Sequence, residues 1–190
     1  MSLEDVIIDY KKYQTDIEHW VTLKGEYRYK SIISFLRDKN IELSWANITR
    51  YVKYDKRLLI NSFKYIVFLE EMYKSFVVKA VGRGNTKILS SSFENAYYEF
   101  LSLGEKANYD DVDLAIMASE KGAFNSFRNK VVHNKILLGT TFNGNSLEKM
   151  FNIFVKILPQ SYRKGFVNDI NNCSKGLTED KWHIKLLLED

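Results

Sequence analysis

The sequence contains few of the residues that interrupt helices or cross-link a chain. There is one proline, and there are nine glycines among 190 residues, so long helices are favoured over many short strands. The one cysteine, Cys173, cannot form a disulfide within the chain, which fits a reducing compartment. No cysteines and histidines cluster at the spacing of a zinc site, so we expect neither a metal nor a cofactor.

No stretch has the pattern of a targeting segment or a membrane span. The chain opens with the acidic pair Glu4 and Asp5, whereas a secretory signal begins basic and continues apolar. No uninterrupted apolar run approaches the roughly 20 residues that a membrane helix needs. We therefore expect a cytoplasmic protein that does not enter a membrane.

The sequence does contain enough apolar residues for a hydrophobic core. Hydrophobic residues make up 45% and charged residues 27%, which is typical of a globular chain and argues against disorder. Twelve tyrosines and twelve phenylalanines predict a core rich in rings. The net charge of +4 permits an anionic partner without requiring one, and the basic segment Lys53 to Arg57 is interpreted as a solvated face. Contact of such segments with an RNA backbone is the alternative. We expect a single domain over residues 1–190.

Apolar residues recur at helical spacing along the whole chain, so the sequence predicts an all-α fold. The longest helix is expected over about 55–81 and closed by Gly82. Its apolar residues lie on two sides, which would bury it at the centre of the molecule. A short segment capped by Ser44 precedes it, and Asn108 to Asp111 is expected to form a turn. The other helices are expected over about 3–22, 27–38, 92–103, 112–118, 121–136, 146–157 and 160–172, with a last one starting at Thr178.

The helix expected over 121–136 carries an unusual polar arc. Its buried stripe recurs at i, i+3 and i+7 and consists of Phe124, Phe127 and Val131. The other arc carries Arg128, Asn129, Val132, His133 and Ile136. Asn129 and His133 are i,i+4 neighbours, whereas Arg128 is set off from His133 by roughly 140° around the helix. Because apolar residues interrupt the polar ones, this arc indicates a groove or an interface.

An arginine, a polar residue, three further residues and a histidine on one helix resemble the Arg-x4-His motif of the HEPN superfamily. A second stretch supports the resemblance, since Asp55 precedes a helix with Glu70 and Lys74 at i,i+4, in the order of the Abi-like, or abortive-infection, branch. The similarity covers about residues 50–140. It implies a HEPN-like helical bundle with a core of about 50–160 and additional N- and C-terminal helices.

The resemblance also implies a function, namely a metal-independent endoribonuclease that acts in phage defence (abortive infection) or as a toxin. His133 would be the general acid and base, because an imidazole exchanges protons near neutral pH. Arg128 would stabilise the phosphate through its fork of donors, and Asn129 would position the reacting groups. Glu70 and Lys74 would support them. The implied partners are an RNA substrate and an antitoxin or regulatory protein.

A homodimer is expected for a chemical reason. Arg128 and His133 diverge around one helix, so one copy presents an incomplete set of groups to a phosphate. Two such helices that meet across a two-fold axis would complete the set.

Each of these residues also has a simpler interpretation. His133 can be a capping or packing histidine near a helix C-terminus, and Arg128 can be a surface ion-pair partner. Asn129 can be an interface amide, and Glu70 with Lys74 can support their own helix. The arc would then belong to a non-catalytic HEPN-like module that binds RNA, a nucleotide or a protein.

Overall fold

The computed structural model describes residues 2–81, 86–104 and 111–188. Within these ranges the regular structure consists of eight α-helices and one short 3-10 helix, with no strand. The prediction of an all-α fold is confirmed. In the part of the chain that the structure describes, no helix combines the length and the apolar character needed to cross a membrane.

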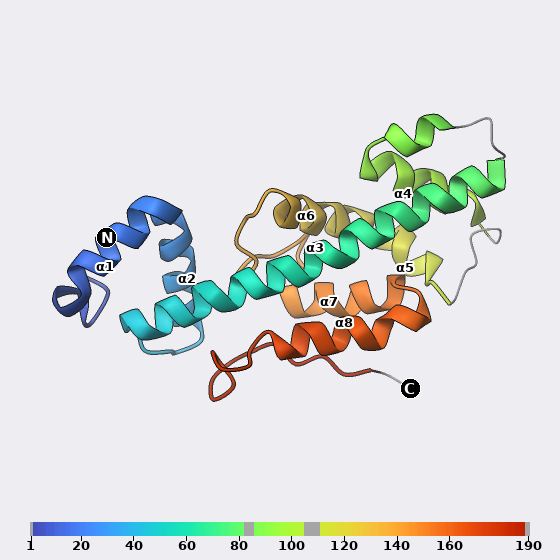
Figure 1. The fold of residues 1–190 in the computed structure, drawn as a ribbon. Coiled ribbons are helices and arrows are strands. Elements are labelled where there is room, and N and C mark those ends of the chain that lie inside the picture. Colours follow the sequence, from blue (N-terminus) through green and yellow to red (C-terminus); the bar gives the residue numbers. More distant parts are fainter. Residues whose placement is uncertain (1, 82–85, 105–110, 189–190) are drawn as a thin grey trace.

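The helix α3, Trp45–Val81, is 37 residues long and forms the axis of the molecule (Figure 1). Residues on several of its sides are buried, as the two apolar stripes predicted. The predicted segment after Ser44 is continuous with this helix, and the Ser44 hydroxyl accepts the N–H of Asn47 at 3.4 Å. The predicted stop at Gly82 and most of the predicted turn from Asn108 lie outside the described residues.

The other elements surround α3 at its two ends and along its two sides (Figure 1). They are α1 Tyr10–Lys24, α2 Glu26–Asp38, η1 Thr86–Ser90, α4 Phe93–Ser102, α5 Leu114–Ser119, α6 Lys121–Val132, α7 Leu147–Ile157 and α8 Gln160–Asn172. α1 and α2 pack at the N-terminal end of α3, and η1 and α4 pack at its C-terminal end. α6 lies along one side, and α7 and α8 lie along the other. This arrangement brings the two motif stretches together, because α6 contacts α3 directly.

Aromatic rings fill the space between α3, α4, α6 and α7. The ring of Tyr73 lies 6.1 Å from that of Phe93, and Phe93 lies 5.6 Å from Phe124 between centroids. Phe124 stacks on Phe154 at 5.4 Å, and Phe127 meets the same ring edge-on at 5.9 Å. Such pairs contribute about 0.5–1.5 kcal/mol each beyond the burial of their area. The predicted ring-rich core is confirmed, and so is the burial of the α6 stripe.

The predicted helix after Thr178 is wrong, because the C-terminal segment is extended. Ile184 and Leu186 are buried and alternate with exposed residues, which is the period of an extended chain. The side chain of Asn171 donates to the Leu186 carbonyl at 3.0 Å and accepts its N–H at 2.8 Å. The Tyr54 hydroxyl accepts the N–H of Ile184 at 2.9 Å. Side chains of α3 and α8 thus satisfy backbone groups that a helix would have paired internally.

The first helix begins later than predicted. Residues 3–9 form turns, and α1 starts at Tyr10. The Asp9 carboxylate accepts the N–H of Trp45 at 2.8 Å, and the N–H of Ile8 donates to the Leu43 carbonyl at 3.2 Å. These contacts with the start of α3 replace the first turn of the predicted helix.

Candidate functional site

α6 runs antiparallel to α3 and is attached to it at two points. Nη2 of Arg128 lies 3.8 Å from Oε2 of Glu70. Beyond the end of α6, Oδ1 of Asn134 accepts a hydrogen bond from Nζ of Lys56 at 3.0 Å. Lys56 precedes Glu70 on α3, whereas Asn134 follows Arg128, so the two segments have opposite directions.

Arg128 is held by a small polar cluster. Its Nη1 donates to Oδ1 of Asn129 at 3.2 Å, and its guanidinium lies over the ring of Phe93 at 5.4 Å. Glu70 also accepts a hydrogen bond from Lys74 at 2.8 Å, as the i,i+4 spacing predicted. The side chain of Arg128 is 24% exposed, and its Nε is buried without a hydrogen-bond acceptor. The cluster has two cations for one anion, so it retains positive charge where Arg128 reaches solvent.

The helix that carries the motif ends earlier than predicted. α6 stops at Val132, and Asn134 has a φ of 53°, in the left-handed region. The N–H of Lys135 donates to the Lys130 carbonyl at 2.8 Å, and the N–H of Asn134 donates to the carbonyl three residues earlier at 3.1 Å. This pair of bonds defines a Schellman motif, in which asparagine is a common alternative to glycine. The prediction of a helix up to 136 is therefore wrong, and Asn134 was the signal for its end.

His133 is the last residue before this turn, and its side chain is exposed. It makes no hydrogen bond or ion pair with another residue in the described ranges, so its imidazole is accessible to a bound molecule. The expectation of an accessible imidazole opposite a buried stripe is confirmed. His133 lies about 7.5 Å along the helix axis from Arg128, because each residue adds about 1.5 Å. Within one copy the structure thus brings Arg128, Asn129, Glu70 and Lys74 together, and His133 stands apart from them.

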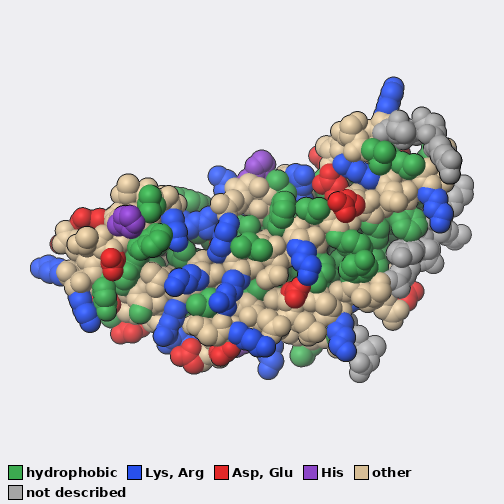
Figure 2. Space-filling model, in the orientation of Figure 1, with side chains coloured by type: hydrophobic (Ala, Val, Ile, Leu, Met, Phe, Trp, Pro, Cys, Tyr) green, Lys and Arg blue, Asp and Glu red, His purple; other side chains and the backbone are tan. Residues whose placement is uncertain are grey.

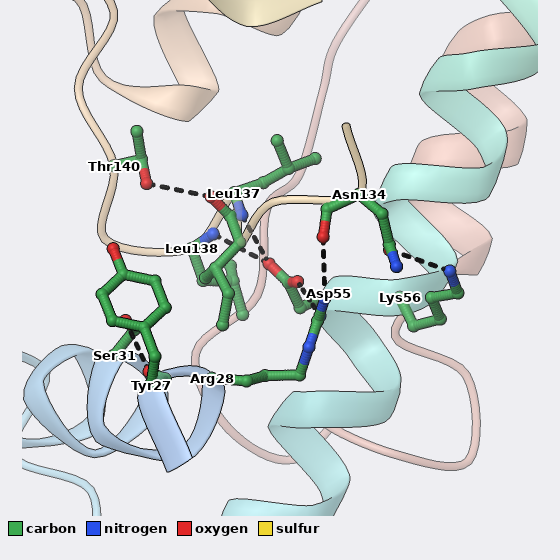
Figure 3. Close-up of polar contacts among 10 residues, drawn as sticks. Tyr27, Arg28, Ser31, Asp55, Lys56, Asn134, Leu137, Leu138 and Thr140 are labelled. Carbon is green, nitrogen blue, oxygen red and sulfur yellow. Dashed lines mark hydrogen bonds and ion pairs between the residues drawn. The ribbon is translucent and has the colours of Figure 1, made fainter. Parts of the chain in front are cut away.

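Asp55 is a structural anchor for the segment that follows His133 (Figure 3). Its Oδ1 accepts the N–H groups of Leu137 and Leu138, each at 2.9 Å. Nη1 of Arg28 lies 3.5 Å from its Oδ2, and Nη2 of Arg28 donates to the Asn134 carbonyl at 2.8 Å. Burial raises the pKa of Asp55, against the opposite effect of the two N–H groups and of Arg28. Asp55 is fully buried, so it cannot contact a substrate directly.

Sequence analysis did not identify Arg28 as part of this network. Arg28 and Asp55 are separated by 27 positions and belong to different helices, so no local spacing connects them. The buried carboxylate was the available signal, because a buried charge requires a partner of opposite charge.

An exposed apolar stripe on α3 lies alongside the outer face of α6. Ile60, Phe63 and Val67 are exposed, and they fall on the same helical face as Lys56 and Glu70, since each step is three or four residues. Lys56 and Glu70 are the two points at which α3 is attached to α6 and its C-terminal turn. The stripe between them therefore runs beside α6.

On α6 itself, Val132 adds to this apolar surface, since its side chain is 36% exposed. The expected contribution of Ile136 to the exposed arc is wrong, because Ile136 follows the end of the helix and is buried. Among the residues that the structure describes, no three His, Cys, Asp or Glu side chains gather as metal ligands would. Comparison with known protein families, curated proteins and solved structures finds no match to this chain.

Proposed function

We propose that this protein is an endoribonuclease of HEPN type that cleaves RNA without a metal ion. The contact of Arg128 with Glu70 supports the proposal most strongly, because it joins the two stretches on which the resemblance rests. The cluster around Arg128 retains positive charge, which attracts a phosphate. His133 is exposed at the end of the same helix and can exchange a proton there.

The proposed reaction uses the 2′-hydroxyl group of the RNA. This oxygen attacks the adjacent phosphorus, and the bond between phosphorus and the 5′-oxygen breaks. His133 accepts the proton of the 2′-hydroxyl or donates a proton to the leaving 5′-oxygen. Arg128 donates hydrogen bonds to the non-bridging oxygens as negative charge develops, and Asn129 fixes the direction of the guanidinium. The products are a 2′,3′-cyclic phosphate and a 5′-hydroxyl end.

A homodimer is part of the proposal, because the two groups do not meet within one copy. The apolar stripe of α3 is centred on Phe63, with Lys56 seven positions before it and Glu70 seven positions after it. If two such helices pack antiparallel across a two-fold axis, the basic end of each stripe meets the acidic end of the other. This contact would bury Ile60, Phe63 and Val67, and it would bring both α6 helices to the same seam.

The first prediction concerns catalysis. Arg128→Ala or His133→Ala should reduce RNA cleavage by about 10²–10⁴-fold, the usual contribution of a proton-transfer group. Activity should survive EDTA. The matched controls are Arg50→Ala and His19→Ala, which remove exposed side chains of the same kinds from other helices. Gel analysis of labelled RNA measures cleavage, and circular dichroism verifies the fold. Loss of activity on chelation, or full activity of the His133 variant, would contradict the proposal.

The second prediction concerns assembly. Sedimentation at micromolar concentration should show a dimer, and Phe63→Glu should dissociate it, because charges of like sign would face each other across the axis. Tyr27→Glu, at an exposed aromatic residue on α2, is the control. Mixing the Arg128→Ala and His133→Ala chains should recover cleavage that neither shows alone. A monomer that still cleaves RNA would exclude the shared site while leaving the motif assignment intact.

The second candidate function is a non-catalytic module that binds RNA, a nucleotide or a protein. One observation favours it, since Arg128 is already engaged by Glu70 and Asn129. Binding of RNA without cleavage by the wild-type chain would support this alternative.

The biological setting follows from the resemblance alone. A role in phage defence or as a toxin predicts that expression arrests growth and that His133→Ala relieves the arrest. Rescue of growth by a second protein would reveal the antitoxin or regulator.

A further inference from the structure

Basic side chains line a cavity of about 550 Å³ between α1, α2 and α3. The cations are Lys24, Arg28, Lys53, Lys56 and Arg57. Figure 2 shows basic side chains gathered over the part of the surface around the N-terminal half of α3. Arg28 has an acidic partner in Asp55. The other four cations have no carboxylate within ion-pair distance among the described residues.

The fold satisfies these cations with neutral groups or leaves them unpaired. Arg57 donates to the carbonyls of Cys173 and Lys175, at 3.1 and 2.7 Å. Lys24 lies over the ring of Trp20 at 4.4 Å. None of these acceptors cancels a full positive charge, so the cavity has an uncompensated positive potential.

Mutual repulsion is visible in the titration of one of the lysines. Burial lowers the pKa of Lys24, and the positive charges of Arg28 and Lys53 lower it further. Three cations from three helices are thus held close together. A bound anion would relieve this repulsion.

The cavity also has apolar walls. Leu23 and Val52 line it, and a smaller adjoining cavity of about 190 Å³ shares Val52 and two of the lysines and reaches the ring of Trp20. An apolar wall beside several cations suits a ligand that combines a flat ring with phosphates. The volume is within the range of about 300–1,000 Å³ that is usual for small-molecule sites.

We propose that this cavity binds consecutive phosphate groups, either those of a nucleoside polyphosphate or those of an RNA strand. Asn134 lines the cavity and directly follows His133, so a strand cleaved at His133 would continue into it. The RNA form of the site rests on the proposed ribonuclease function, whereas the nucleotide form does not. In both forms the cavity recognises phosphate and reads no base sequence.

The test uses the double variant Lys24→Gln/Lys53→Gln. Neither ammonium group donates a hydrogen bond to another described residue, so the substitution leaves the internal contacts of the fold intact. The control Lys149→Gln/Lys164→Gln removes the same charge from exposed positions on α7 and α8. All chains also carry His133→Ala, so that binding is measured without cleavage and independently of catalysis.

The probes are inorganic tripolyphosphate, ATP and a single-stranded RNA of about 12 nucleotides. Calorimetry should show that at least one probe binds, about tenfold more weakly to the Lys24/Lys53 variant than to the control. For RNA, the slope of log K against log salt concentration should fall by about 1.4, because each single-strand phosphate contact contributes about 0.7. Tighter binding of RNA than of ATP identifies the strand as the ligand, and the reverse identifies a free nucleotide. Equal binding by the variant and the control, or no binding of any probe at millimolar concentration, overturns the proposal.

Discussion

Asp55 and Glu70 both belong to the motif region, and their surroundings give them different roles. Asp55 is fully buried and accepts two backbone N–H groups, so it fixes the chain after His133. Glu70 reaches solvent and contacts two cations, Lys74 and Arg128. The first carboxylate acts on the position of the site, and the second acts on the charge within it.

The prediction at this scale compares two substitutions of Asp55. Asp55→Ala should lower the free energy of unfolding by about 3–5 kcal/mol, because Arg28 and two buried N–H groups lose their acceptor. Asp55→Asn should cost less, because an amide oxygen can still accept both N–H groups. Urea denaturation measures both, with exposed Asp16→Ala as the control. A loss below about 1 kcal/mol in the alanine variant would show that Asp55 is not the anchor.

Among the elements, α6 and its C-terminal turn decide where the motif groups lie. The helix holds Arg128 against α3, and the Schellman turn ends it directly after His133. Asn134 links this turn to two other helices, since its carbonyl accepts from Arg28 and its side chain accepts from Lys56. The direction of the chain at His133 is therefore set from α2 and α3.

Substitution of Asn134 tests this conclusion. Asn134→Val should lower stability by about 1–2 kcal/mol, because a β-branched residue is strained at a φ of 53°. Asn134→Gly should be nearly neutral, because glycine adopts this conformation freely and offsets the loss of the bond from Lys56. Thermal unfolding measures the difference, with Asn172→Val at the end of α8 as the control. Equal stability of the valine and glycine variants would mean that the turn is not constrained.

At the scale of the whole molecule, packed tyrosines connect stability to pH. Burial is the main cause that raises the pKa of Tyr51 and Tyr65 to about 12, and the hydrogen bond to Asp169 also raises that of Tyr65. The ordinary pKa of tyrosine is near 10, which applies to the unfolded chain. A pKa raised by folding means that the neutral tyrosine stabilises the fold fully below about pH 10. This contribution is lost as the pH rises through about 12.

We therefore expect the protein to unfold between about pH 10 and 12, with one group of tyrosines ionising only as it unfolds. Near-ultraviolet absorbance of tyrosinate, followed together with circular dichroism, measures both events. Cys173 provides an internal check, because burial raises the pKa of its thiol to about 11 and should slow its reaction with thiol reagents in the folded state. Ionisation of all tyrosines in one step near pH 10, with the fold intact, would contradict this expectation.

The sequence by itself determined the features that depend on neighbours along the chain. Helical spacing of apolar residues predicted α3 as the buried centre, and serines marked helix starts within one residue of the observed caps, Ser92 and Ser146. The spacing of Glu70 and Lys74 predicted their ion pair, and the wheel of α6 predicted a buried stripe opposite an exposed His133. These features need only the geometry of one helix, which is known from the sequence.

Only the tertiary structure decided which of these residues meet. Asp55 binds N–H groups 82 and 83 positions away, and no local period encodes a contact at that separation. The C-terminal segment became extended because Asn171 and Tyr54 satisfy its backbone, although its apolar residues also fit a helix. The basic cavity was likewise absent from any one stretch, because its cations come from three helices. Long-range contacts compete with local preference, and their free energies outweigh it wherever a backbone group or a charge is buried.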